Sequence, residues 1–234
     1  EPATTNQRME VQAALEAVFV GCAKEDACNK RYPDLRADWQ RLLASLPVAT
    51  TLQHPLTGRE ERLTWRRDTV LGAVRGPLYV PALASGLPAA IHEAARQRFA
   101  PLLGLASAMS GPGGGLATGM HFSVVGAALE PRMGEAQGAP GADFGQGFAD
   151  FYRQVCADWP RGVPPAEFYR IGPAPAATLV LSGGADPATP PRHGERVARL
   201  LDRGTAFLEL SPLAGLGMHD DDGKKSVMGG GSIV

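Results

Sequence analysis

The sequence lacks the features that would place it in a membrane or on nucleic acid. None of its apolar runs reaches the roughly 18 residues that a transmembrane helix needs, and residues 1–5 have neither the basic start nor the apolar core of a signal peptide. Lysine and arginine together number 23 against 24 aspartates and glutamates, so the formal net charge of −1 provides no attraction for nucleic acid or an anionic bilayer. We therefore expect neither a membrane span nor a nucleic-acid partner.

Cysteine is also scarce, with three residues in the whole chain. Cys22 and Cys28 are six residues apart around a charged segment, a spacing that allows a local disulfide in an exported protein. The alternative is two reduced thiols on adjoining helices. No further cysteine or histidine stands nearby to complete a metal site, so no metal is expected there. Cys156 is left over and is expected to be a free, partly buried thiol.

The residues that are present suffice for a buried core, because hydrophobic residues make up 44% of the chain and charged residues 20%. Apolar side chains recur at helical spacing through the first half. Pro55 to Gly58 predicts a turn between hairpin strands at 50–52 and 62–65, and Asp68 is expected to cap the helix that follows. The expected helices span residues 7–20, 35–46, 69–79, 89–99 and 101–109.

After a glycine-rich break at 110–115, the pattern changes to a mixture of helix and strand. Residues 120–125 have strand composition and no helical period, and a helix is expected over 148–158. Two short apolar runs then have the composition of buried parallel strands. These strands are expected at 178–182 and 206–210, with a helix over 194–201 between them. The fold class that we predict is α/β.

The stretch from Thr178 to His219 carries the clearest chemical signal. Its first strand ends at Gly183-Gly184-Ala185-Asp186-Pro187, a helix and a second strand follow, and His219 comes next in a glycine-rich loop. This order is typical of the last two members of the catalytic triad in α/β-hydrolases, where histidine takes the serine proton and aspartate fixes the histidine tautomer. The alternatives are a turn or helix-capping role for Asp186 and a solvent-exposed loop position for His219.

The other histidines are assigned structural positions. His121 is expected to be a hydrogen-bonded core residue, His54 a loop residue and His92 a helix-face residue. His193, at the start of a helix, is expected on the surface. The run Asp220-Asp221-Asp222 lacks the spacing and the turn glycine of a calcium loop, so a solvated tail is expected.

The triad lacks its first member. No G-x-S-x-G pentapeptide occurs anywhere in the 234 residues, although the nucleophilic serine of such a hydrolase sits in that motif, upstream of the aspartate. The chain is therefore expected to be part of an enzyme whose nucleophile lies elsewhere or has been lost, and to be inactive alone.

Several segments, in this order, resemble the secreted α/β-hydrolases of the tripeptidyl-aminopeptidase and proline-iminopeptidase group. The most specific is Leu179 to Pro191; the others are Cys22 with Cys28-Asn-Lys-Arg-Tyr-Pro-Asp-Leu35, Met120 to Val125, and Cys156-Ala-Asp-Trp-Pro160. The resemblance implies an incomplete α/β-hydrolase fold, with a helical lid over 1–115, the end of the catalytic domain over 116–219 and a polar tail over 220–234. It also implies catalytic roles for Asp186 and His219, a small peptide or ester substrate, no cofactor and an extracytoplasmic location.

The chain departs from that group in ways that bear on activity. Gly126-Ala127-Ala128-Leu129 stands where the group has Cys-Ala-Glu-Asp, which removes the disulfide partner that the resemblance implies for Cys156. His219 is not in the usual Gly-His-Gly, and the tail after it is too polar and glycine-rich for a core helix.

Two hypotheses of different classes follow. In the first, the chain supplies the lid, Asp186 and His219 to a serine hydrolase (a peptidase, aminopeptidase-like, or an esterase) that is active only with an N-terminal segment carrying the serine. In the second, it is a catalytically inactive remnant that acts as a binding protein. In either case, the edge of the remaining sheet is exposed unless another polypeptide covers it.

Overall fold

The computed structural model describes residues 3–109, 117–129, 143–145, 147–173, 176–201 and 205–210. The chain forms two compact units, residues 1–161 and 162–234. The sequence-based domain boundary at 115/116 therefore differs from the boundary between compact units. One reason is that Asp143 bonds to Trp39 and Gln12, which ties the segment before the ninth helix to the first helices.

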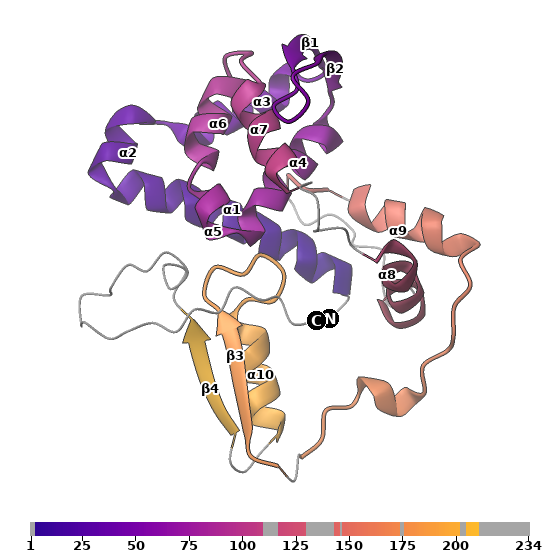
Figure 1. The fold of residues 1–234 in the computed structure, drawn as a ribbon. Helices are drawn as coiled ribbons and strands as arrows, with labels where there is room; N and C mark the ends of the chain where they lie inside the picture. The colour runs from indigo at the N-terminus through magenta and orange to yellow at the C-terminus, as the bar shows by residue number, and fades with distance from the viewer. Residues whose placement is uncertain are drawn as a thin grey trace. The chain divides into compact units, whose positions relative to one another are not determined.

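Helices build most of the first unit (Figure 1). The predicted helix at 7–20 is confirmed within a longer one, and those at 35–46, 101–109 and 148–158 are confirmed within a residue or two. The elements are α1 Ala3–Lys24, α2 Asp26–Arg31, α3 Leu35–Ser45, α4 Arg67–Arg75, the 3₁₀ turn η1 Gly76–Tyr79, α5 Pro81–Ala84, α6 Leu87–Ala94, α7 Ala100–Ala108, α8 Thr118–Val124, the π-helical turn η2 Val125–Leu129, and α9 Gly147–Ala157.

The predicted hairpin is confirmed as two antiparallel strands, β1 Val48–Gln53 and β2 Glu60–Trp65. The turn closes through a bond from the Gly58 N–H to the His54 carbonyl, 2.8 Å long. Gly58 has φ of +67°, a conformation that glycine adopts without steric cost. This geometry explains why a glycine ends the turn.

Two expectations about helix ends were wrong. Asp68 does not cap α4, which begins one residue earlier and has no side-chain cap; Asp68 instead lies in the first turn, where its charge complements the positive end of the helix dipole. The helix expected over 89–99 begins at Leu87 and ends at Ala94. Pro88 sits in its first turn, where proline's missing N–H costs no hydrogen bond.

A continuous apolar core joins α1, α3, α4, α6 and α7. Trp39, Leu15, Leu42 and Leu87 are fully buried in it, and the rings of Trp65 and Phe99 stack with centroids 4.7 Å apart. The buried positions of α3 (Leu35, Trp39, Leu42 and Leu43) are those that its helical spacing indicates. The first unit therefore has a core of its own.

The strand expected at 120–125 is wrong, because residues 118–124 form α8. Strand propensity depends on neighbours that offer hydrogen bonds and a packing surface. Within the described part of the first unit, the only sheet is the β1–β2 hairpin. As a helix, the segment satisfies its own backbone bonds and brings Phe122 against Tyr152 of α9, with ring centroids 6.0 Å apart.

The second unit confirms the predicted strand, helix and strand. It contains the 3₁₀ turn η4 Ala166–Tyr169, β3 Thr178–Gly183, α10 Pro191–Leu201 and β4 Thr205–Leu210. The two strands are parallel, with Thr178 opposite Thr205 and Gly183 opposite Leu210, and α10 lies beside them (Figure 1). Helices together with parallel strands place the chain in the α/β class. Among the described helices, none is both long and apolar enough to cross a membrane.

Candidate functional site

The loop after β3 holds Asp186 in a fixed geometry. The Asp186 N–H donates to the Gly183 carbonyl at 3.1 Å, which turns the chain at the carboxyl end of the strand. One carboxylate oxygen, Oδ1, accepts the N–H groups of Ala188 and Thr189 at 2.8 and 3.0 Å. The other, Oδ2, accepts the Thr189 hydroxyl at 2.7 Å. The carboxylate is therefore held by its own loop, and Pro187 beside it is fully buried.

This geometry serves the turn-capping role of Asp186 directly and leaves room for a second role. An ionised carboxylate offers about four acceptor positions, and the loop occupies three of them. The side chain lies at the carboxyl end of a parallel strand, where ligands bind in open α/β sheets.

The chain leaves β4 at the same edge of the sheet. Leu210, the last residue of β4, pairs with Gly183, which begins the Asp186 loop. His219 comes nine residues further along the chain and lies outside the described residues. His193, expected on the surface, lies in the first turn of α10 and is half-buried.

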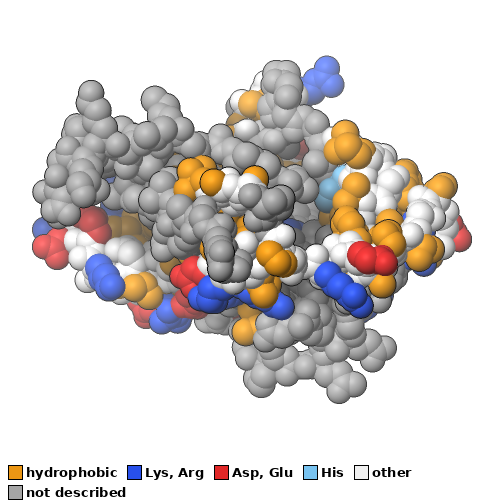
Figure 2. All heavy atoms as spheres, turned by 90° about the horizontal axis from the view of Figure 1, so that it is seen from below, with side chains coloured by type: hydrophobic (Ala, Val, Ile, Leu, Met, Phe, Trp, Pro, Cys, Tyr) orange, Lys and Arg blue, Asp and Glu red, His pale blue; other side chains and the backbone are white. Residues whose placement is uncertain are grey.

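One face of β3 is left uncovered. Leu179 and Leu181 are 60% and 53% exposed, whereas Ser182 is buried and α10 packs on the strand. Parallel sheets are normally covered on both faces. In the space-filling view, hydrophobic side chains also reach the surface in several patches (Figure 2).

In the first unit, Cys22 at the end of α1 and Cys28 in α2 form a disulfide, with their Cα atoms 5.1 Å apart. Glu25 caps α2 by accepting the N–H groups of Ala27 and Cys28. The disulfide therefore closes a short turn between α1 and α2 whose conformation the Glu25 cap also stabilises. Cys22 is buried in the core of this unit.

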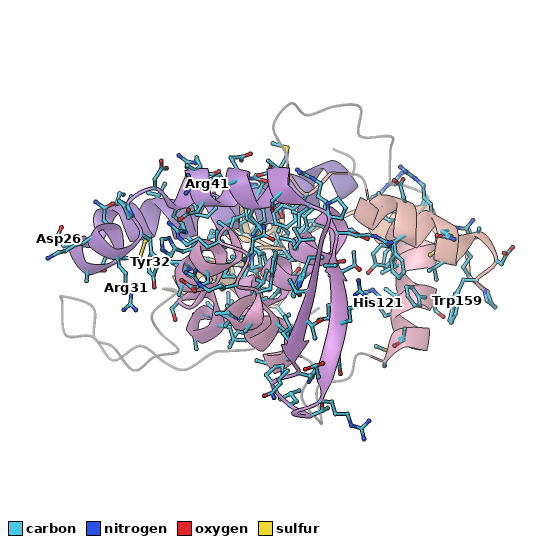
Figure 3. The ribbon with its side chains drawn as sticks, turned by 90° about the horizontal axis from the view of Figure 1, so that it is seen from above. Asp26, Arg31, Tyr32, Arg41, His121 and Trp159 are labelled. Atoms are coloured by element: carbon cyan, nitrogen blue, oxygen red, sulfur yellow. A yellow bond between two sulfur atoms is a disulfide. The ribbon has the colours of Figure 1, made fainter. Side chains whose placement is uncertain are left out.

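A buried ionic cluster around Asp38 joins α3 to α6 and was missed by the sequence analysis. Asp38 is 2% exposed, and its carboxylate accepts His92 Nδ1 at 2.7 Å and Arg96 at 3.2 Å. Arg41, which is labelled in Figure 3, lies one turn along α3 and also donates to this carboxylate. Asp38 lies on the apolar face of α3, where a carboxylate needs polar partners, so its position in the sequence already indicated a buried ionic contact. Nothing in the sequence indicated that its partner is His92, 54 residues away.

The pKa of Asp38 reflects two opposing influences. Burial raises the pKa of this carboxyl, but the hydrogen bonds from His92 and Arg41, with the charge of Arg96, outweigh burial, so the pKa lies below its usual value. Asp38 is therefore an ionised anchor between two helices. His92, expected as a helix-face residue, is half-buried and packs edge-on against the Tyr32 ring.

Aromatic side chains join α8 to α9. His121 Nε2 lies 2.6 Å from the Tyr152 hydroxyl, and the Trp159 N–H donates to the Ser123 hydroxyl at 3.1 Å. Figure 3 labels His121 and Trp159 in this part of the chain. Burial raises the pKa of Tyr152 above its usual value. The expected hydrogen bond of His121 is thus confirmed, but the residue is half-buried on a helix and not in the core. Ser123 already serves as an acceptor and a back-bonding donor to Gly119.

Gly126 lies directly against the buried Cys156. A Cβ atom at position 126 would stand 3.2 Å from the Cys156 sulfur and 3.6 Å from its Cβ. Cβ atoms across a disulfide are about 3.5–4.5 Å apart. The distance between the two Cβ positions is therefore within the range that a disulfide spans, and the Cys156 sulfur faces a glycine. In the described ranges, no group of three or more metal-ligating side chains converges.

Parallel strands connected through a helix, with an aspartate at the carboxyl end of the first strand, are features of the α/β-hydrolase superfamily. Residues 142–215 match the family model described as TAP-like protein. This match confirms, for the C-terminal part of the chain, the resemblance inferred from its motifs. Neither the comparison with curated proteins nor that with solved structures finds a match.

Proposed function

We propose that this chain supplies the lid and the acid-and-base segment of a serine hydrolase, acting on peptide or ester bonds. Asp186 and His219 are the second and third members of the triad. The nucleophilic serine and the oxyanion loop come from a segment outside these 234 residues. The chain alone is then inactive.

The observation that carries this proposal is the position of Asp186. It lies at the carboxyl end of a parallel strand, inside the segment that matches the TAP-like family, and one acceptor position of its carboxylate is left by the loop. In a triad, the aspartate accepts the histidine Nδ1–H and stabilises the imidazolium that forms when serine loses its proton. Asp186 is suited to that task because three hydrogen bonds fix its orientation.

The uncovered face of β3 supports the need for a further segment. Leu179 and Leu181 are exposed on a parallel strand, and such strands are normally buried on both faces. Additional strands and helices of a larger sheet would bury these leucines. They would also bring the turn that carries the nucleophilic serine to the carboxyl end of the sheet, where Asp186 lies. The Cys22–Cys28 disulfide supports an extracytoplasmic location, since disulfides persist in oxidising compartments.

The first experiment is labelling with a fluorophosphonate probe, read by intact mass. We expect no adduct on the purified chain and one adduct on a complex with a hydrolase segment that carries G-x-S-x-G. An adduct on the chain alone that His219→Ala abolishes would contradict the proposal. No adduct in either case would favour an inactive remnant.

A second experiment separates the two roles of Asp186. Asp186→Asn keeps the acceptor for the Ala188 and Thr189 N–H groups but removes the charge, whereas Asp186→Ala removes both. For the complex, we expect Asp186→Asn to lower kcat by about 10⁴-fold without loss of stability, as for a triad aspartate. Asp158→Asn, an exposed aspartate at the end of α9, is the matched control. Full activity in Asp186→Asn would exclude a triad role for Asp186 and leave it only the role of capping its turn.

A second candidate function, an inactive binding protein, is favoured by Gly126. A Cβ at this position would lie 3.6 Å from the Cys156 Cβ, a distance that loss of a disulfide-forming cysteine at position 126 would leave. The labelling experiment distinguishes the two functions, because only the hydrolase gains a reactive serine in the complex.

A further inference from the structure

A pocket of about 700 Å³ lies in the first unit, between α1, the first two turns of α4, the turn at 143–145 and the start of α9. Its volume is in the range of small-molecule sites, roughly 300–1,000 Å³. All its lining residues belong to the helical unit, so the pocket does not depend on the proposed triad.

Positive charge gathers on one side of this pocket. Arg66, Arg67 and Arg75 line it, and residues 67, 71 and 75 are spaced four apart, which places them on one face of α4. The first turn of α4 has no side-chain cap, so its leading N–H groups add positive potential beside Arg66 and Arg67, whereas Arg75 lies in the last turn of the helix. Guanidinium groups bind carboxylates through paired, charge-assisted hydrogen bonds.

Two carboxylates also line the pocket, and one of them is already engaged. Asp143 accepts the Trp39 N–H at 2.8 Å and the Gln12 amide at 3.4 Å, and its carbonyl oxygen accepts Arg67 at 3.2 Å. Its side chain is 14% exposed, so it acts as an anchor for the turn. Asp68 lies exposed in the first turn of α4. Arg67 also pairs with the Asp143 carboxylate at 3.5 Å, and Arg75 donates to the Tyr79 hydroxyl at 3.4 Å. Arg66, just before the first turn of α4, is therefore the cation that we expect to meet a ligand's carboxylate.

The remaining walls are apolar. Val11 and Leu71 come from α1 and α4, Phe144 packs against the core, and Phe151 is 49% exposed on α9. Gly72, one helical turn before Arg75, leaves the space open, because a Cβ there would meet nothing within 4 Å. A pocket with arginines at its rim and an apolar wall fits a ligand that has an anionic group and an apolar part.

We propose that this pocket binds an apolar molecule that ends in a carboxylate. The carboxylate lies among the arginines at the start of α4, and the apolar chain lies along Leu71, Phe144 and Phe151. A fatty acid and the C-terminus of an apolar peptide share this chemistry. The chain of a fatty acid has no polar groups, whereas a peptide has amide groups that need hydrogen-bond partners.

The test is titration calorimetry of the full chain with decanoate, below its micelle concentration, and with N-acetyl-trileucine. We expect saturable binding of at least one carboxylate. The corresponding amide, decanamide or N-acetyl-trileucinamide, should bind roughly tenfold more weakly, as expected for loss of a charge-assisted bond. Tighter binding of decanoate identifies the fatty acid as the source, and tighter binding of the tripeptide identifies the peptide. Equal affinity for acid and amide would overturn the proposal.

Two pairs of variants locate the site. Gly72→Leu fills the pocket and should lower affinity about tenfold or more, while Gly104→Leu on α7, where a Cβ also meets nothing within 4 Å, should not. Arg66→Gln should lower affinity for the carboxylate but not for the amide, while Arg62→Gln on β2, outside the pocket, should change neither.

Unfolding in urea checks that each variant is folded, and Gly72→Ala provides a smaller substitution if Gly72→Leu is not. Unchanged binding in folded Gly72→Leu would place the ligand elsewhere and overturn the proposal. Because the chain is assayed without a nucleophile, this result is independent of hydrolase activity.

Discussion

The two units of this chain bury their apolar residues to very different degrees. In the helical unit, Trp39, Leu42 and Leu87 are fully buried, and a disulfide and a buried ionic cluster reinforce the contacts. In the second unit, β3 leaves Leu179 and Leu181 more than half exposed. The comparison indicates that the first unit is stabilised by its own core, whereas the described strand β3 of the second unit leaves apolar side chains exposed.

A leucine-to-alanine substitution made once in each unit should give the largest difference in stability between them. Leu42→Ala should lower the free energy of unfolding by about 2–5 kcal/mol, because it removes a fully buried side chain and leaves a cavity. Leu181→Ala, the same change at a 53% exposed position, should cost less than about 0.5 kcal/mol. Urea unfolding measures both. Equal losses would mean that Leu181 is buried in solution.

The helical unit should gain stability from a second disulfide. Gly126→Cys is expected to pair with Cys156, because a Cβ at position 126 would stand 3.6 Å from the Cys156 Cβ. The loop-entropy model gives a gain of about 3–4 kcal/mol for a loop of this length. Mass spectrometry under non-reducing conditions checks the bond, and thermal unfolding with and without reductant checks the gain. Leaving the thiols unpaired under oxidising conditions would contradict the expected geometry.

The Asp38 cluster makes the stability of the helical unit sensitive to acid. The pKa of Asp38 is lower in the folded state, so its contribution is complete above the unfolded pKa and is lost as pH falls through the folded pKa. Asp38→Asn should cost about 1–3 kcal/mol at neutral pH and should flatten the acid limb of the stability profile. Asp26→Asn, an exposed aspartate in α2, is the control. An unchanged acid limb in Asp38→Asn would show that other groups set it.

The smallest change in folding stability is expected on the uncovered face of β3. Leu179→Lys should alter the free energy of unfolding by less than about 0.5 kcal/mol, because the side chain is 60% exposed. It should lower self-association, since a charge on an exposed strand opposes strand pairing. Analytical ultracentrifugation measures this, with Thr178→Lys, half-buried at the start of the strand, as a comparison. Self-association that persists in Leu179→Lys would show that the chain associates through a surface other than this face of β3.

Local patterns in the sequence were enough to predict most of the elements. The spacing of Leu35, Trp39 and Leu42 predicted α3 and its buried face, and the apolar runs after Ala176 predicted two strands with a helix between them. Residues 120–125 show the limit of such patterns. Their β-branched and aromatic composition fits a strand, yet the segment forms α8 because its packing partner is the aromatic face of α9.

The candidate sites divide in the same way. Asp186 at the end of β3 could be predicted, because a strand followed by Gly-Gly-Ala-Asp-Pro is a local pattern; that its carboxylate is held by Thr189 could not. The Asp38–His92 pair and the pocket over α4 join residues that are far apart in the chain. Neighbouring residues along the chain were enough to predict most of the helices and the two parallel strands, and the lack of a G-x-S-x-G motif can be read directly from the residues. Which charges meet and which apolar faces stay open could be learned from the fold alone, because both depend on distances through space.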